Sequence, residues 1–453
     1  MSNKHDFLTS PIHRILLRMS ASNSVSILAA ASFALVDTFF ISQLGTHALT
    51  AINFTHPITL MLISCAVGLG VALSTLLSRL LGEKNHHQVK LLFQHCSLIA
   101  FVSIFLLSTL CYFATPYVFM MLGAQANTLS LIESYLHVWY LGFPIFTLMI
   151  LNQQTLRALG AVQMNAAIVV ISALLNFILD PVFIFGFEHW DGLGIQGAAL
   201  ASVVAWSCSL IISYVFIKKH KLLFLLPAGF NKHILKNNFK RIYKIATPAA
   251  LTLMLTPLMN AVLLLLLART NLQAVAAFGT GLQIQSFVLI GVTALSSTLV
   301  PFLAQNLGAN QEQRAYDALH YSYRLIFIWH ILLFFLLHHF AESIATLFTQ
   351  DLQVHYWLTF YLKWLPLGFA PLSMMILFAN ALNAYQKPML SVCVNIIRSL
   401  LLAIPLALIG QYFFQESGIF CSTLIANIVM GVICVNLSKR LAPEFGTQKV
   451  LLH

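Results

Sequence analysis

The chain consists largely of apolar blocks, each long enough to cross a lipid bilayer as a helix. A helix needs about 20 apolar residues to span the hydrocarbon core. Because that core offers no water to satisfy backbone polar groups, and because the blocks lack strict alternation, we expect helices and not a closed β-barrel. Twelve such blocks follow one another, at about residues 16–42, 51–78, 91–115, 130–156, 162–186, 195–217, 242–268, 275–303, 322–348, 355–383, 390–413 and 418–440.

Composition supports this fold class, an all-α membrane protein with twelve transmembrane helices. Of the 453 residues, 59% are hydrophobic and only 8% are charged, whereas a soluble protein carries about 25% charged residues. The first apolar block continues to full spanning length, so no cleavable signal peptide is predicted. The seven cysteines are scattered with no CxxC spacing, so we interpret them as packing residues and predict no bound metal or disulfide.

The basic residues predict the orientation in the membrane. They concentrate at the termini and in the connections after even-numbered blocks, with eight between Lys218 and Lys244 alone. The opposite connections hold only Arg269 and Lys363. Positive residues stay on the cytoplasmic side, so we expect both termini in the cytoplasm of a bacterium and the chain in its inner membrane. We expect the basic cluster to face membrane lipids, and no nucleic acid.

The two halves of the chain align with one another, which indicates a duplication. A shift of 226 residues pairs Leu81-Gly82 with Leu307-Gly308, and a shift of 224 later pairs Pro181 with Pro405. We therefore predict an N-terminal six-helix bundle at 1–217, a basic cytoplasmic linker at 218–241 and a C-terminal six-helix bundle at 242–453. Both copies start on the inside, so they form parallel repeats around a central cavity, and a monomer suffices.

Two carboxylates lie where a membrane helix rarely tolerates them. Of thirteen acidic residues, only Asp37 and Asp180 lie well inside apolar blocks. A carboxylate at the helix centre costs about 2.5–3.5 kcal/mol, so it normally faces a cavity or a partner and marks a functional path. Asn176 precedes Asp180 by four residues, which puts both on one helix face. Such a group could bind and release H⁺, or hold Na⁺ with its oxygen atoms; the other interpretation is a protonated acid that only fixes helix packing.

Several motifs resemble those of the multidrug and toxic compound extrusion (MATE) transporters, in the branch of the DNA-damage-inducible protein F. They are VDTFFISQLG in the first block and LRALG, NFILDPVFIFG and GIQGAALAS in the fourth to sixth. The resemblance extends over the whole chain. It implies a secondary active exporter, coupled to H⁺ in preference to Na⁺, which acts by alternating access on small-molecule drugs that are cationic or amphipathic.

The resemblance also implies site residues. The coupling-ion positions of the family fall on Asp37, Asn176, Asp180 and Ser202, and Na⁺, if it is the ion, would lie at the first three. Less directly, spacing places cavity residues at Tyr135 and Gln153, whereas Arg157 matches a residue that we interpret as structural. The family usually has a proline fifteen residues before the first aspartate, where this chain has Ser22. A bend of the first helix, which in some relatives depends on that proline, is therefore less expected here.

Two other function classes fit less well. A lipid-linked precursor flippase of the same superfamily would have a cationic cavity, and we expect few lysines or arginines inside the membrane blocks. An intramembrane enzyme would need a catalytic motif, but HExxH, GxSxG, a Walker A sequence and GxGD are all missing from the sequence. We therefore predict no enzyme activity and no cofactor beyond the coupling ion.

Overall fold

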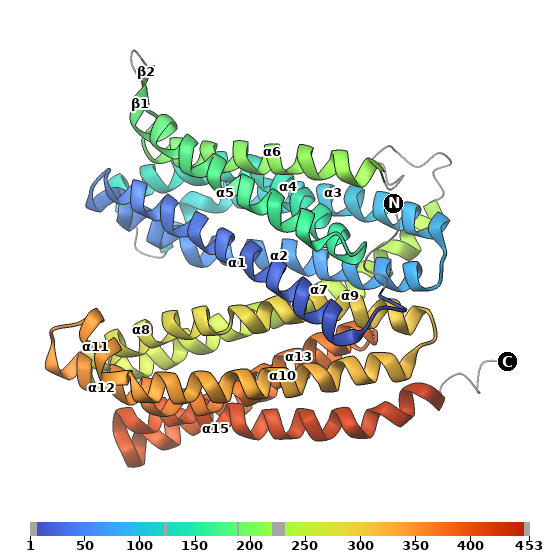
Figure 1. Cartoon of the computed structure of the whole chain (residues 1–453). Helices are drawn as coiled ribbons and strands as arrows, with labels where there is room; N and C mark the ends of the chain where they lie inside the picture. The colour runs from blue at the N-terminus through green and yellow to red at the C-terminus, as the bar shows by residue number, and fades with distance from the viewer. Residues whose placement is uncertain (1–6, 122–124, 188–189, 220–231, 448–453) are drawn as a thin grey trace. The chain divides into compact units, whose positions relative to one another are not determined.

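The structure, a computed structural model, describes residues 7–121, 125–187, 190–219 and 232–447, and nearly all of them are helical (Figure 1). The first half contains α1 (Ile12–Ser42), α2 (Thr46–Gly82), α3 (His86–Met121), α4 (Ala126–Ala158), α5 (Val162–Phe185) and α6 (Ile195–Lys219). The second half contains α7 (Lys232–Ala268), α8 (Leu272–Val288), α9 (Ile290–Gly308), α10 (Glu312–His339), α11 (Ala341–Phe348), α12 (Leu352–Trp364), α13 (Phe369–Ala384), α14 (Pro388–Ile396) and α15 (Ile404–Thr447). A 3₁₀ turn, Leu365–Gly368, joins α12 to α13, and a π-helical stretch, Ile397–Ala403, joins α14 to α15.

These helices confirm the predicted membrane architecture. Eleven stretches of the described residues are apolar and long enough to cross a membrane. The last of them, Pro388–Lys439, contains two predicted spans, which divide at Gln415, where φ of 51° and ψ of −130° leave the helical region. The predicted span eight is also interrupted, at Leu289 between α8 and α9.

Three boundaries differ from the prediction. The ninth span was placed at 322–348, but α10 ends at His339 and the separate helix α11 follows, because the apolar run continues past the actual helix end. The seventh helix begins at Lys232, so the second part of the predicted linker is helical, and residues 220–231 of that linker lie outside the described residues. Between α5 and α6 the chain forms a small antiparallel hairpin of β1 (Gly186–Phe187) and β2 (Trp190–Asp191).

Contacts divide the chain into two compact units. The first contains Ala21–Ala250, and the second contains Phe7–Ser20 together with the chain from Leu251 onward. The division thus falls inside α1 and inside α7, and not at the predicted linker. In the second unit the N-terminal segment is held by Arg314, whose guanidinium donates hydrogen bonds to the carbonyl oxygens of Phe7 and Ser10.

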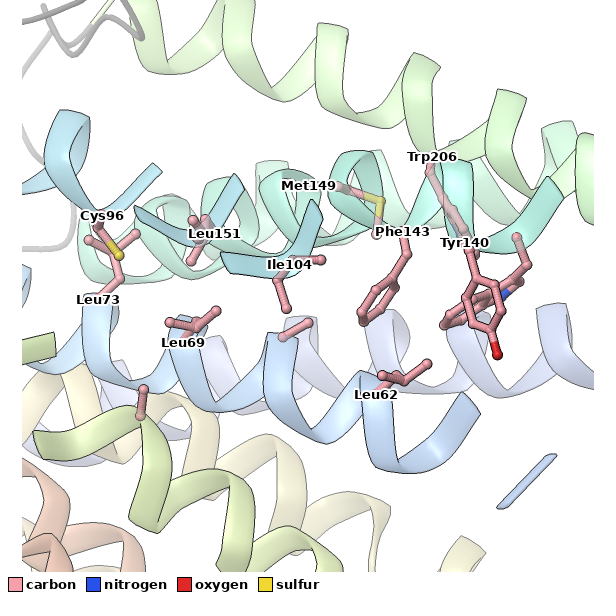
Figure 2. Packing of buried hydrophobic residues seen from close by; sticks show 14 of the residues in the cluster. Leu62, Leu69, Leu73, Cys96, Ile104, Tyr140, Phe143, Met149, Leu151 and Trp206 are labelled. Carbon is pink, nitrogen blue, oxygen red and sulfur yellow. The ribbon is translucent and has the colours of Figure 1, made fainter. Parts of the chain in front are cut away.

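The core of the first unit lies around α4, which packs against α2, α3 and α6. Figure 2 shows apolar side chains from these helices meeting along the bundle, among them Leu73, Ile104, Phe143 and Trp206. This packing holds the helices that carry the polar residues described below.

Repeated helix ends support the duplication. After α2, Asn85 N–H donates to the carbonyl of Leu80, and after α9, Gln311 N–H donates to that of Asn306. The residues before these donors, Lys84 and Asn310, have left-handed φ values of 56° and 62°. The same 226-residue shift relates the turn at Gly160 (φ 77°) after α4 to the turn at Gln386 (φ 59°) after α13. All four are Schellman-type ends, in which a left-handed residue lets the chain satisfy the last helical carbonyls.

Candidate cation-coupling site

The centre of the candidate site is a hydrogen-bonded pair on α5. Asn176 and Asp180 are both fully buried, and the Nδ2 of Asn176 donates a hydrogen bond of 3.0 Å to Oδ1 of Asp180. Four residues of α-helix bring two side chains to the same face, so the local sequence suffices to place this pair. The predicted proximity of these two residues is therefore present in the structure.

Asp37 on α1 joins the pair from another helix. Its side chain is 9% exposed, and it lies close enough to Asp180 for the two negative charges to repel one another. Oδ1 of Asp37, Oδ2 of Asp180 and Oδ1 of Asn176 are all buried without a hydrogen-bond partner among the described residues. Buried carboxylates normally have partners, because an unpaired negative charge away from water is costly. These three oxygens therefore form an acceptor-only cluster that a proton or a small cation would complete.

A cavity of about 450 Å³ opens beside Asp37 in the first unit. Tyr135 and Gln153, predicted as cavity residues, line it together with Asp37 and Ser202, whereas Asn176 and Asp180 are not among its lining residues. Tyr135 is also near enough to both aspartates to interact with their charges. The arrangement puts one acid in the cavity and the other in the protein interior, with the hydroxyl groups of Ser202 and Tyr135 at the cavity wall.

Much of the remaining cavity wall is apolar and aromatic. Trp139 and Trp206 lie edge to face with ring centroids 6.0 Å apart, and Phe146 lies 4.9 Å from Trp206. Such walls favour flat, partly apolar ligands, because aromatic pairs offer large contact areas with few directional bonds. These rings could not be predicted as site residues, since nothing in an apolar run distinguishes a cavity aromatic from a lipid-facing one.

Several polar residues of the cavity, among them Ser172 and Arg157, were missed or given another role. Ser172 lines it from α5, one turn before Asn176, and its hydroxyl donates to the carbonyl oxygen of Ala205 at 3.2 Å. Its spacing of four residues from Asn176 was a usable signal. Arg157, which was interpreted as structural, also lines the cavity, from the last turn of α4.

The oxygen atoms of the site suit H⁺ or Na⁺ and not a transition metal. No cluster of three or more histidine, cysteine or acidic side chains exists among the described residues. Hard cations such as Na⁺ prefer carboxylate, amide and hydroxyl oxygens, the groups that Asp37, Asp180, Asn176 and Ser202 provide. At the position of the family proline, Ser22 lies inside α1, which is one helix from Ile12 to Ser42.

A buried cation in the second unit contradicts the expectation about the apolar blocks. Arg398 lies in the π-helical stretch between α14 and α15 and is 3% exposed. The sequence analysis missed it because the basic residues were assigned to the ends of the blocks, although Arg398 lies well inside the eleventh. It lines a small pocket of about 90 Å³ whose other lining residues also belong to the second unit.

Comparisons with known proteins agree with the fold. Residues 24–182 and 248–409 match the MatE family model. The chain is 43% identical to the FAD transporter of Shewanella oneidensis over 442 residues, which cover 97% of each protein. It is 28% identical to the multidrug export protein MepA of Staphylococcus aureus over 93% of this chain and 92% of that protein.

Solved structures extend this likeness to three dimensions. The bent form of the Vibrio cholerae MATE transporter VcmN superimposes with a TM-score of 0.91 at 26% identity and covers 96% of this chain and 98% of that one. An outward-facing multidrug resistance MATE transporter superimposes with a TM-score of 0.89 at 20% identity, which shows the fold. With twelve spans, an internal duplication and a family model that matches both halves, this chain belongs to the MATE family, and is a membrane transporter and not an enzyme.

Proposed function

We propose that this protein is a secondary active exporter of the bacterial inner membrane that uses H⁺ as its coupling ion. One observation carries the proposal: Asp37, Asn176 and Asp180 each have a buried oxygen without a donor among the described residues, and the charges of the two aspartates interact. Two neighbouring buried carboxylates resist being ionised together, so a proton that bridges or neutralises them is stabilised by the site. Na⁺ at the same oxygens is the second candidate ion.

Substrate export is coupled to ion entry if the ion and the substrate bind with opposite preference for the two states of the transporter, one open to the cytoplasm and one open to the outside. Asp37 belongs to both the acidic cluster and the cavity wall, so a substrate in the cavity contacts one of the groups that hold the proton. A free-energy link between two binding events is reciprocal, so substrate binding releases the proton to the same degree as protonation releases the substrate.

For the substrate we propose FAD or a flavin dinucleotide of its kind. The relative named as an FAD transporter is 43% identical over nearly the whole chain, whereas the multidrug export protein MepA is 28% identical. The aromatic rings of Trp139 and Trp206 in the cavity suit the flat isoalloxazine ring. Amphipathic cationic drugs are the second candidate, because the carboxylate of Asp37 would attract their positive charge and the apolar part of the cavity wall would contact the rest of the molecule.

The test is transport by the purified protein in liposomes with an imposed pH gradient. FAD, riboflavin and ethidium are offered in separate experiments, and a fluorescent lipid-linked precursor serves to examine the flippase alternative. We expect FAD movement that depends on the gradient and stops in Asp37→Asn. FAD movement that persists without a pH gradient or a membrane potential, or ethidium transport without FAD transport, would contradict the corresponding part of the proposal.

The orientation completes the proposal. With the basic connections inside, both termini lie in the cytoplasm, and export carries substrate away from them. A single chain contains both repeats and the complete acidic cluster, so the monomer is the proposed transporting unit.

A further inference from the structure

The pocket around Arg398 is the repeat counterpart of the cavity in the first unit. The 226-residue shift, which relates the start of α5 at Val162 to the start of α14 at Pro388, also relates lining residues of the two pockets. Three such pairs are Thr59 with Gln285, Tyr135 with Tyr361, and Met149 with Met375. At the same shift Arg398 takes the place of Ser172. The duplication has therefore produced two equivalent pockets with different polar groups.

Among the described residues, the hydrogen-bond partners of Arg398 are neutral groups. Its Nη2 donates to Oγ1 of Thr256 at 2.9 Å and to Oγ of Ser399 at 3.3 Å, and its Nη1 donates to Oδ1 of Asn427 at 3.3 Å. Its Nε is buried and has no partner among the described residues. Hydroxyl and amide oxygens hold the guanidinium in place, but they leave its full positive charge uncompensated.

The pocket contains no acid to pair with this charge. None of the described residues that line it is an aspartate or glutamate. The sequence of spans seven, eight, ten and eleven has no acidic residue either. A buried cation without a counter-ion is costly in a membrane protein and normally marks a ligand path. The pocket therefore offers a place for a negative charge that a ligand would supply.

The remaining lining groups suit a small anionic group. Asn260, Gln285 and Asn395 provide amides, and the hydroxyl of Tyr361 donates to Oε1 of Gln285 at 2.7 Å. The volume of about 90 Å³ has room for several water molecules or one small anion. Guanidinium binds phosphate and carboxylate oxygens through parallel hydrogen bonds, and the unpartnered Nε belongs to the edge that forms them.

We propose that the Arg398 pocket is an anion subsite that binds a phosphate group of the transported substrate. The identification of the phosphate as that of the substrate rests on the proposed export function, since a free phosphate or a lipid headgroup has the same chemistry. Such a subsite would select a substrate that carries phosphate, such as a flavin dinucleotide.

The test measures binding of FAD and of riboflavin, which has no phosphate, to the full-length protein in phosphatidylcholine nanodiscs. We expect FAD to bind at least about tenfold more tightly than riboflavin, the range that one charged hydrogen bond provides. Arg398→Gln should remove this preference and leave riboflavin affinity unchanged, while Arg398→Lys should retain part of it. Arg269→Gln, which removes an exposed arginine at the end of α7, is the matched control and should behave as wild type.

A second variant keeps the test decisive if Arg398→Gln does not fold. Asn427→Asp is nearly isosteric and places a carboxylate on the Nη1 of Arg398, so it supplies the counter-ion within the chain. We expect this variant to fold and to lose the preference for FAD. An unchanged preference for FAD over riboflavin in Asn427→Asp would overturn the subsite, as would equal binding of the two flavins to wild type.

Two further arms separate the sources of phosphate and the two proposals. Inorganic pyrophosphate should compete with FAD for binding to wild type. If FAD binding is lost in nanodiscs of phosphatidylglycerol, an anionic lipid, the pocket binds lipid and the substrate subsite is overturned. If liposomes show no FAD export while Arg398-dependent FAD binding persists, the export function fails and the subsite stands. If FAD is exported but its affinity does not change when Arg398 is replaced, the export function stands and the subsite fails.

Discussion

The side-chain amide of Asn176 donates a 3.0 Å hydrogen bond to Oδ1 of Asp180, one helical turn further along α5, while Oδ2 of the same carboxylate has no partner among the described residues. One donor is too few for a buried carboxylate, which can accept several hydrogen bonds. The pair is therefore incomplete without a proton or a cation, and this incompleteness can be tested by mutation.

Removing either acid should uncouple transport. Asp37→Asn and Asp180→Asn keep the shape of the side chain but cannot change charge with pH, so gradient-driven efflux should fall to the level of empty liposomes. Asn176→Ala and Ser202→Ala should lower it roughly two- to tenfold, because one hydrogen bond contributes about 0.5–1.5 kcal/mol. Initial rates of efflux under an imposed pH gradient provide the measurement.

The control for these variants is Glu83→Gln, which removes an exposed acid that pairs with Arg79 just after α2. It should transport as wild type. Substrate addition should also release protons from the solubilised wild-type protein and not from Asp37→Asn. Full efflux by the double variant Asp37→Asn, Asp180→Asn would refute coupling at this cluster.

A methyl group at Gly142 should destabilise the first unit. A Cβ at this position on α4 would overlap the side chain of Val203 on α6. Overpacking of this kind typically costs about 1–3 kcal/mol, so Gly142→Ala should lower the unfolding temperature in detergent, and adding Val203→Ala should restore most of it. Gly279→Ala on α8, where the structure leaves open space, should leave the unfolding temperature unchanged or raise it.

Cysteine labelling can decide the orientation. We expect a cysteine at Gln350, between α11 and α12, to react with a membrane-impermeant maleimide in intact cells. A cysteine at His87, at the start of α3, should react only after the cells are opened. Both positions are exposed in the structure, and the experiment uses a background without the seven native cysteines. The reverse pattern would invert the proposed topology.

One ion pair outside the core predicts a small dependence of stability on pH. The hydrogen bond from Lys363, 2.7 Å from Oε1 of Glu342, and its charge hold the pKa of the Glu342 carboxyl below the ordinary value of 4.5. A pKa that is lower in the folded state stabilises the protein above the unfolded value, and this contribution is lost as the pH falls through the folded value. Wild type should therefore melt slightly higher than Glu342→Gln at pH 7, and the difference should shrink as the pH falls below 4.5. A difference that grows on acidification would exclude this pair as its cause.

Features that arise from residues close together in the chain could be predicted from the sequence, whereas features that arise from packing between distant segments could not. The spans followed from apolar length, and the Asn176–Asp180 pair followed from helical spacing, because both are local. The end of α10 at His339 was misplaced, since apolar residues continue on both sides of the short polar stretch at Glu342 and Ser343 and the prediction joined them into one span. The nearness of Asp37 to Asp180 needed the packing of two helices, which no spacing encodes, and was available only through family resemblance.

The role of Arg398 could not be predicted from the sequence for a different reason. Its charge was visible, but it was counted with the basic residues of the connections, and no acidic partner pointed to it. The structure shows that neutral side chains far apart in sequence, Thr256 and Asn427, hold it in place. A buried ion whose partners are neutral leaves no complementary charge in the sequence, so only three-dimensional proximity reveals it.

The charges of Asp37 and Arg398 have an electrical consequence. If a dianionic flavin dinucleotide that binds at Arg398 leaves the cell while one proton that binds at Asp37 enters, both movements carry positive charge inward. A membrane potential contributes about 2.3 kcal/mol per elementary charge for each 100 mV, so three charges gain roughly 7 kcal/mol per 100 mV in one cycle. Such a cycle would generate an inward current and would run on voltage alone, at equal pH on the two sides of the membrane.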